Sequence, residues 1–312
     1  MKPTTVAVLG AGGMLGSMIV DELSRDGRLE VIAAARDELW THEGPKRVPG
    51  ARWCSIEIGD RHPTMAALRA LGPVDWFVNA TGIIKQRIRD DRPSDVEAAV
   101  LVNALFPHWL AAAGRELGAK VLQIATDCVY SGGRGEYVET DTHDAVDVYG
   151  WTKSLGEVPG PGFYSLRCSI VGPEPRRSVS LLEWFRRQPA HAAVSGYANH
   201  RWNGVTTLHF ARICGSVIRG NLALPNLQHV VPSGEITKND LLRCFADSFH
   251  RRDVTITPVD TPNPINRTLS TLNLDCNHLI WSDAGYPGGP PTIRQMIAEL
   301  AAFDYRLKDT RT

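Results

Sequence analysis

The chain alternates between short apolar runs and longer segments in which apolar residues recur every three or four positions. Short apolar runs bounded by turn residues are typical of buried strands, and the periodic segments are typical of amphipathic helices. We expect strands at residues 6–9, 29–35, 51–58, 74–78, 121–125, 164–171 and 227–231. Strands that alternate with helices predict an α/β fold, a Rossmann-type doubly wound parallel sheet of about seven strands.

The pattern changes beyond Pro173. Proline and glycine become frequent and the segments shorter, with helices expected at 181–185, up to Ile218, at 236–249 and at 292–302. We expect residues 1–172 to form a dinucleotide-binding domain. Residues 173–312 should form mainly a smaller C-terminal substrate-binding lobe, with 205–250 returning to the Rossmann sheet.

Composition narrows the classes of function. The 34 basic residues balance 34 acidic ones, so the charge gives no indication of nucleic acid or an anionic membrane as a partner. No apolar run approaches the roughly 20 residues of a membrane-spanning helix, and the N-terminus has no signal-peptide pattern. The six cysteines lack metal-ligand spacing, so we expect reduced thiols, a cytoplasmic location and no metal site.

A glycine-rich turn follows the first predicted strand and leads into the first periodic segment. Strand, glycine turn and helix make a dinucleotide site, because bare backbone lets a pyrophosphate approach and the helix N-terminus supplies amides and positive potential. The turn has the spacing Gly-x-x-Gly-x-x-Gly with one glycine added. Its candidate cofactor-binding residues are Gly10, Gly12, Gly13, Met14, Leu15 and Gly16.

The ends of the next strands suggest the rest of a cofactor site. Arg36 and Asp37 follow the second strand, where an arginine accommodates a 2′-phosphate and an acidic residue binds a ribose hydroxyl. Arg36 comes first and favours NADP(H), while Asp37 leaves NAD(H) open. Asp60 follows the third strand, beside the expected adenine. The turn after the fourth strand, where a cofactor can cross the sheet, comprises Asn79, Ala80, Thr81 and Gly82.

The candidate chemistry lies between residues 126 and 153. Thr126 ends the fifth predicted strand, and Tyr149 and Lys153 share one face of a predicted helix because they are four residues apart. A cation beside a phenol is expected to lower the phenol pKa from about 10. The phenol and the Thr126 hydroxyl can meet over one carbonyl oxygen, which indicates proton delivery to a carbonyl that receives a hydride.

Further polar residues accompany these three. Asn103 interrupts the apolar face of a helix expected at 94–117, where it either bridges core backbone or supports the active site and cofactor through a hydrogen-bonded relay. The polar and aromatic stretch 196–207 suggests a ligand site or an irregular surface loop. It supplies four substrate-side candidates, Tyr197, Asn199, Trp202 and Asn203.

Together, these motifs resemble the extended short-chain dehydrogenase/reductases, and most closely the dTDP-4-dehydrorhamnose reductase group of nucleotide-sugar reductases. The motifs occur in order over nearly the whole chain, at 10–16, 79–82, 102–104, 125–132, 149–157, 166–172 and 266–269. The resemblance implies an NAD(P)H-dependent enzyme that reduces the ketone of a nucleotide-linked deoxysugar, commonly at C4. It assigns proton donation to Tyr149, lowering of its pKa and binding of the nicotinamide ribose to Lys153, and a hydrogen bond to the carbonyl to Thr126.

The chain also departs from related enzymes. Sugar dehydratases carry an Asp-Glu pair after the hydroxyl residue, and here Asp127-Cys128 stands in its place, so dehydration is not expected. Cys128 matches a cysteine that moves protons in GDP-fucose synthase, with Glu174 in place of the partner histidine, which keeps an epimerase-reductase open. Asp127 and Cys128 are also substrate-side candidates, and so is Arg267, whose guanidinium suits a diphosphate.

Two further alternatives remain open. The family also resembles the regulatory subunit of methionine adenosyltransferase, a binding partner without turnover. Pro159-Gly-Pro-Gly162 stands where a long helix usually continues toward a dimer interface, so a homodimer is neither implied nor excluded.

Overall fold

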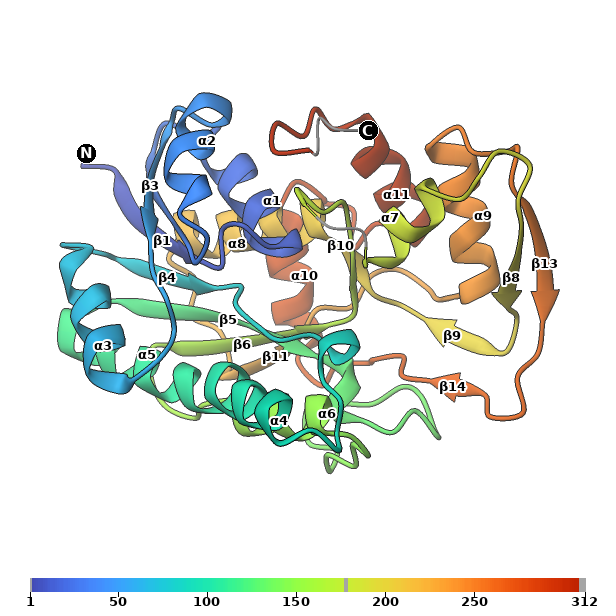
Figure 1. Ribbon diagram of the computed structural model, residues 1–312, viewed down its shortest axis with the longest axis horizontal. Coiled ribbons are helices and arrows are strands. Elements are labelled where there is room, and N and C mark those ends of the chain that lie inside the picture. Colours follow the sequence, from blue (N-terminus) through green and yellow to red (C-terminus); the bar gives the residue numbers. More distant parts are fainter. Residues whose placement is uncertain (1, 177–178, 309–312) are drawn as a thin grey trace.

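A parallel sheet forms the centre of the computed structural model, which describes residues 2–176 and 179–308. Its strand order is β11-β6-β5-β4-β1-β2-β3, and all neighbouring pairs are parallel (Figure 1). The strands are β1 Thr4–Leu9, β2 Leu29–Ala35, β3 Ala51–Ser55, β4 Trp76–Asn79, β5 Lys120–Thr126, β6 Phe163–Cys168 and β11 Leu227–His229. The Rossmann-type prediction is confirmed, with β3, β6 and β11 ending earlier and β4 starting later than expected.

Alternation along the strands divides the core into two layers. In β1, Val6 and Val8 belong to one apolar cluster, and Ala7 and Leu9 belong to the other. Both faces are therefore covered, as buried parallel strands require. Helices α1 (Met14–Leu23), α2 (Leu39–Arg47), α8 (Thr207–Gly220) and α10 (Leu274–Asp283) cover one face, and α3 (Arg61–Ala70) and α5 (Phe106–Leu117) cover the other (Figure 1).

The helix expected at 94–117 is built from three pieces. Helix α4 (Pro93–Ala99) passes through a π-helical stretch, η2 (Val100–Leu105), into α5. By length and composition alone, Pro93–Leu117 meets the test for a membrane span, which corrects the expectation that no run approaches one. Its buried side packs against the sheet, and core helices of soluble proteins pass the same test.

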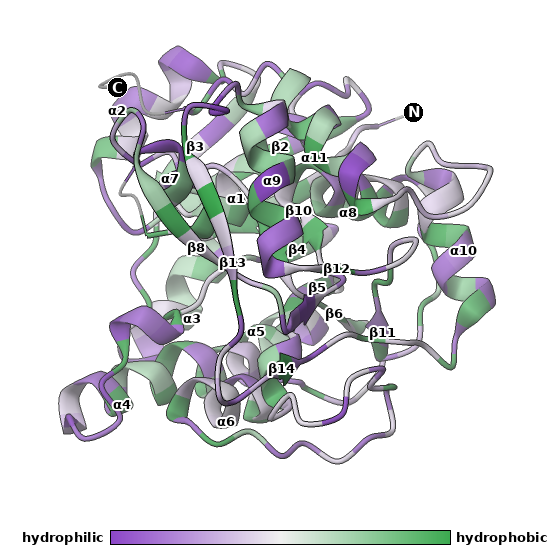
Figure 2. Ribbon diagram, turned by 90° about the vertical axis from the view of Figure 1, so that its right-hand side faces the viewer, coloured by the Kyte–Doolittle hydropathy of each residue, from purple (hydrophilic) through white to green (hydrophobic). Residues whose placement is uncertain are grey.

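The smaller lobe lies beyond the carboxyl ends of the strands (Figure 1). Strands β8 (Ala193–Tyr197) and β13 (Thr255–Val259) run parallel and lie side by side (Figure 2), and β9 (His200–Trp202) pairs with β12 (Ile236–Thr237) and β14 (Ile265–Asn266). Helices α7 (Leu181–Arg186), α9 (Lys238–Ser248) and α11 (Ile293–Ala302) complete the lobe.

The stretch 205–250 divides between the two parts of the molecule. Helix α8 packs on α1, and β11 pairs with β6 in the main sheet. Helix α9 instead packs against β8, β13 and α11 in the lobe. A two-residue pair, β7 (Ile170–Val171) with β10 (Val205–Thr206), links the parts. The remaining elements are the 3₁₀ turns η1 (Lys85–Arg87) and η3 (Asp127–Val129), and helix α6 (Val148–Leu155).

Candidate active site

The glycine turn requires glycine for steric reasons. Gly10 has φ of +82°, and a Cβ there would lie 2.8 Å from the carbonyl oxygen of Ala80, at the end of β4. A Cβ on Gly16 would lie 2.2 Å from the Gly10 carbonyl oxygen. Gly13 precedes α1, is exposed and has no capping side chain. The turn therefore packs tightly underneath and leaves the helix N-terminus open, which fits a bound pyrophosphate.

The other cofactor-side residues lie at the carboxyl ends of neighbouring strands. Arg36 is exposed beyond β2, and Asp60 is exposed just before α3. Asn79 is buried and builds the turn after β4: its amide nitrogen donates to Gln123 at 2.7 Å and its oxygen accepts from the Thr81 amide and hydroxyl. In this turn, Ala80 and Gly82 adjoin Gly10 and Asn103 respectively.

Thr126 and the short turn η3 form the end of β5. The Thr126 hydroxyl oxygen accepts from the Cys128 amide at 3.2 Å, and its proton points toward an Asp127 oxygen 3.3 Å away. Thr126 and Asp127 are both buried. Burial raises the pKa of the Asp127 carboxyl, while the positive charges of Arg267 and Lys238 lower it.

Helix α6 carries Tyr149 and Lys153 against this turn. Asp147 begins the helix by accepting from the Gly150 amide at 2.8 Å. A Cβ on Gly150 would lie 2.5 Å from the Cys128 carbonyl oxygen, so glycine allows the helix to approach the turn. The Lys153 ammonium donates to the Ile124 carbonyl of β5 at 2.8 Å. The Thr126 side chain lies close enough to the Tyr149 phenol to lower its pKa, and the Lys153 ammonium is bound two residues earlier on the same strand.

The expected lowering of the Tyr149 pKa is wrong for the protein without ligands. Burial raises the pKa of the phenol, and negative charge on Cys128 acts in the same direction, whereas the Thr126 side chain lowers it. Burial also lowers the pKa of the Lys153 ammonium to about 8, against the attraction of Glu157 and Cys168. Tyr149 therefore keeps its proton at neutral pH, as a proton donor must.

Asn103 lies in the π-helical stretch, a geometry that recurs at functional sites. Its side chain accepts from the Ile83 amide at 2.8 Å, donates to the Ile83 carbonyl at 3.0 Å and reaches the Thr152 hydroxyl at 3.2 Å. A Cβ on Gly156 would lie 2.1 Å from the Asn103 carbonyl oxygen. Asn103 thus bridges backbone and joins the cofactor-side turn to the helix of Lys153.

The acid–base pair expected of Cys128 and Glu174 is not formed. One Glu174 oxygen accepts from the amides of Val179 and Ser180, at 2.8 and 3.1 Å, and so orders the approach to α7. Burial and the Asp127 charge raise the pKa of the Cys128 thiol to about 12. The groups whose charges act on this thiol include Asp127 and Arg267 but not Glu174.

The substrate-side candidates separate into two groups. Asn199 and Asn203 use their amides to bridge the backbone of Thr261 and Leu269, and Tyr197 is 44% exposed beside His200. Trp202 and Arg267 lie near the turn η3, Asp127–Val129. Trp202 is buried and donates to Ser169, while Arg267 donates to the carbonyls of Tyr130 and Ser131 at 2.7 and 3.1 Å.

Lys238 is the residue that the sequence did not single out. It begins α9, and its ammonium lies 5.1 Å from the centre of the Trp202 ring, with no hydrogen-bond partner among the described residues. Burial lowers its pKa to about 8, and the charges of Asp127 and Cys128 oppose that shift. The Thr237 hydroxyl caps α9, and a threonine at this position predicts a helix start. It does not predict in which direction the side chain of Lys238, the next residue, points.

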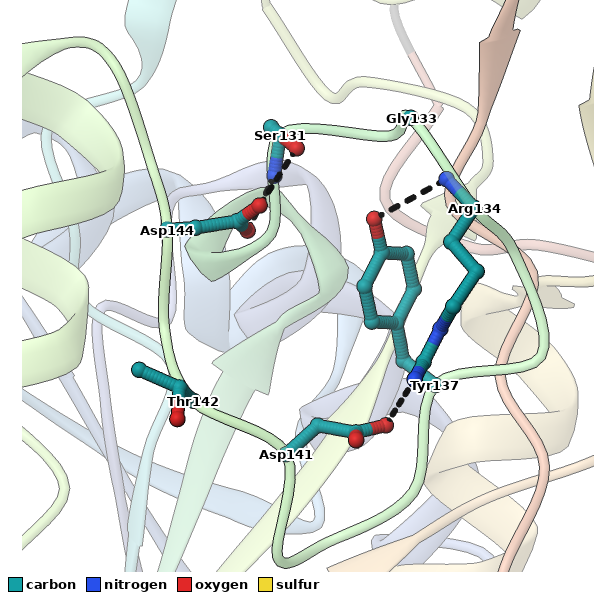
Figure 3. Close-up of a pocket in the computed structure, with 7 residues that line it drawn as sticks. All are labelled: Ser131, Gly133, Arg134, Tyr137, Asp141, Thr142 and Asp144. Carbon is teal, nitrogen blue, oxygen red and sulfur yellow. Dashed lines mark hydrogen bonds and ion pairs between the residues drawn. The ribbon is translucent and has the colours of Figure 1, made fainter.

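A hollow of about 450 Å³ lies beside the turn η3 (Figure 3). Its polar groups are mutually satisfied: the Ser131 hydroxyl donates to Asp144 at 2.6 Å, and Arg134 pairs with Asp141. It is lined by Ser131, Gly133, Arg134, Tyr137, Asp141, Thr142 and Asp144. Within 2–176 and 179–308, no group of three or more His, Cys, Asp and Glu residues could hold a metal ion.

Comparison with known proteins agrees with this geometry. Residues 4–279 match the family described as RmlD substrate binding domain. The chain is 28% identical to the spore coat polysaccharide biosynthesis protein SpsK of Bacillus subtilis over 155 residues, which are 49% of this chain and 47% of that protein. It is 28% identical to dTDP-4-dehydrorhamnose reductase of Aggregatibacter actinomycetemcomitans over 48% of this chain and 44% of that protein. The matched region thus spans about half the length of these relatives.

Solved structures extend the likeness to the whole fold. A dTDP-4-dehydrorhamnose reductase from Bacillus anthracis in complex with NADP superposes with a TM-score of 0.73 at 17% identity, over 96% of this chain and 99% of that one. A Clostridium acetobutylicum ortholog gives 0.71 at 20% identity, over 96% and 99%. The match over residues 4–279, which includes the glycine turn and the end of β5, shows that the chain belongs to the RmlD substrate binding domain family.

Proposed function

We propose that this protein is an NADPH-preferring reductase that reduces the 4-keto group of a nucleotide-linked keto-deoxysugar, with Tyr149 as proton donor. The observation that supports the proposal is the nearness of Thr126 to Tyr149 at the end of β5, with Lys153 bound to the Ile124 carbonyl of the same strand. That strand end lies two strands from the glycine turn after β1. Ligands of open parallel sheets bind at the carboxyl ends of such strands.

The chain's own residues divide the work as follows. The Thr126 hydroxyl binds the keto oxygen, and the Tyr149 phenol, protonated because burial raises its pKa, donates a proton to that oxygen. The Lys153 ammonium, anchored on Ile124, would bind the nicotinamide ribose of a bound dinucleotide and would supply positive charge as the phenol loses its proton. A bound reduced nicotinamide supplies the hydride, and the glycine turn holds its pyrophosphate.

Direct turnover tests the proposal. The purified protein should oxidise NADPH when given a dTDP-linked 4-keto-6-deoxysugar, and the sugar product should carry a new hydroxyl. Tyr149→Phe should lower kcat by about 10²–10⁴-fold, because the proton donor is lost. Tyr164→Phe removes a phenol near the start of β6, at the opposite end of the sheet from Thr126, and serves as the matched control, with kcat unchanged. Equal rates for Tyr149→Phe and the parent would refute the assignment.

The two alternatives give different results in the same assay. An epimerase-reductase using Cys128 would incorporate solvent deuterium at the carbon next to the ketone, and Cys128→Ser would abolish the incorporation. The raised thiol pKa and the engagement of Glu174 with the amides of residues 179 and 180 weigh against it. A regulatory subunit without turnover would bind the dinucleotide and oxidise none of it with any nucleotide-linked ketone.

A further inference from the structure

Asp37 is not free to bind a ribose. It follows β2, where a carboxylate would accept hydrogen bonds from the ribose hydroxyls of NAD(H). One of its oxygens accepts from the Leu39 amide at 3.0 Å, and the other lies 2.7 Å from Nη1 of Arg176. Both carboxylate oxygens are therefore already engaged within the chain.

Arg176 comes from a segment 139 residues further along the chain. The segment follows β7 and brings the guanidinium carbon to 5.7 Å from the centre of the Trp40 ring. Trp40 lies directly against the glycine turn, since a Cβ on Gly12 would be 2.4 Å from the indole nitrogen. The contact with Trp40 and the pair with Asp37 together fix Arg176 at the adenosine end of the candidate dinucleotide site.

Two guanidinium groups, those of Arg36 and Arg176, belong to residues next to or paired with Asp37, and the charge of Arg176 also acts on Glu43. Arg36 is exposed and has no ion-pair partner in the described part of the chain. The side chains of Arg176 and Asp37 are 30% and 57% exposed, and pairs this exposed contribute little to folding stability. The pair therefore adds little to folding stability, and the partly exposed guanidinium of Arg176 remains accessible to a ligand.

We propose that Arg176 is a cofactor-specificity residue that binds the 2′-phosphate of NADPH together with Arg36 and holds Asp37 away from the ribose. The inference rests on the proposed function, because it needs a dinucleotide on the glycine turn. A guanidinium binds a phosphate through parallel hydrogen bonds, and two of them match the charge of the 2′-phosphate. The same arrangement disfavours NADH, because Asp37 must leave Arg176 before it can bind a ribose hydroxyl.

Binding of adenosine fragments tests the inference without turnover. In calorimetry, the parent protein should bind 2′,5′-ADP more tightly than 5′-AMP. Arg176→Ala should weaken 2′,5′-ADP about ten- to hundredfold and leave 5′-AMP unchanged or tighter, as expected for loss of one charged hydrogen-bonding group. Arg176→Lys should recover part of the loss, and Asp37→Asn should leave 5′-AMP binding unchanged, because Asp37 is held away from the ribose.

Arg28→Ala is the matched control. Arg28 also forms an exposed pair with an aspartate, at 2.8 Å, and it precedes β2 at the opposite end of the strand. Arg28→Ala should leave the affinities for 2′,5′-ADP and 5′-AMP unchanged, and also the ratio of KM for NADPH to KM for NADH. Arg176→Ala should raise that ratio and retain kcat. If Arg176→Ala prefers 2′,5′-ADP over 5′-AMP as strongly as the parent does, the inference about Arg176 is wrong and the proposed function is unaffected. A parent that binds neither fragment would overturn the proposed function with it.

Discussion

Lys153 is the buried cation on which the proposed chemistry depends most. It is 6% exposed, and its ammonium donates to a carbonyl oxygen of β5 rather than to a carboxylate. Without an ion-pair partner at close range, burial lowers its pKa to about 8. The positive charge that should support proton donation by Tyr149 is therefore lost within the range of pH in which enzymes are assayed.

The pH profile should show this loss. We expect kcat/KM to be constant below about pH 8 and to fall as pH rises through the Lys153 pKa, because kcat/KM reports the ionisation of the free enzyme. Lys153→Arg should shift the fall out of the measured range, since a guanidinium stays protonated. Steady-state rates from pH 6 to pH 10 check this. A fall that begins only near the ordinary lysine pKa of about 10.4 would contradict the assigned environment.

Lys238 should act on the sugar nucleotide rather than on the dinucleotide. Its ammonium faces Asp127 and Cys128 without a hydrogen-bond partner among the described residues, so a substrate group can fill that need. Lys238→Met should raise KM for the sugar nucleotide about ten- to hundredfold and leave KM for NADPH unchanged. Lys120→Met is the control, because Lys120 also lies 5.1 Å from a tryptophan ring, at the far end of β5. Equal changes in both KM values would exclude this role.

Helix α6 is the element that sets the distance between phenol and hydroxyl. Gly150 lies where the helix meets the turn η3, with no room for a methyl group between the Ala145 side chain and the Cys128 carbonyl. Gly150→Ala should push the helix away, at a cost of about 1–3 kcal/mol in unfolding free energy, and should lower kcat more than it changes the KM for NADPH.

Gly215→Ala in α8 provides the comparison for Gly150→Ala. The added methyl group would meet the flexible end of the Arg219 side chain at 2.8 Å, which can move aside. Thermal unfolding and steady-state kinetics on both variants separate the two positions. If Gly150→Ala retained full kcat while losing stability, α6 would not be the element that positions the phenol.

At the level of elements, the sequence predicted correctly those strands and helices whose own residues determine their secondary structure. The central strands of the sheet, such as β1 and β4, are mainly apolar because helices cover both faces, so each could be recognised without its neighbours. Strand β13 was missed because it is largely exposed and contains Pro258, and α10 was missed because its five apolar residues do not form a clear stripe along one face. Lys238 and Arg176 were missed for another reason: each reaches its site from a distant segment, through tertiary packing that no spacing encodes.

At the scale of the whole molecule, a buried cation joins the catalytic helix to the sheet. Arg167 of β6 is fully buried and donates to Glu157, just beyond α6, at 3.1 and 2.5 Å. It also donates to the Nε2 atoms of His143 and His229, at 2.7 and 2.9 Å. Because arginine stays charged, both imidazoles must accept as neutral rings. They then donate through Nδ1 to Ser154 of α6 and to the backbone beyond β14.

Protonation of these rings should therefore lower the unfolding free energy, because it adds positive charge beside Arg167. Burial and Arg167 lower the pKa of His229 to about 4, below the value of about 6.5 in an unfolded chain. The unfolded state binds the proton more readily, so this contribution is complete above about pH 6.5 and is lost as pH falls toward 4. It amounts to at most about 3 kcal/mol, and His209, whose pKa is also lowered to about 4, contributes in the same window.

Denaturant unfolding at a series of pH values measures how the unfolding free energy depends on pH. The unfolding free energy should fall steadily from pH 6.5 to pH 4.5, and His229→Gln should flatten the curve, because its amide keeps an acceptor for Arg167 but does not titrate. His278→Gln, an exposed histidine on α10, should leave the slope as it is. A parent slope that survives His229→Gln unchanged would place the acid sensitivity elsewhere, in the His209 cluster that joins α8 to α11 through Glu299.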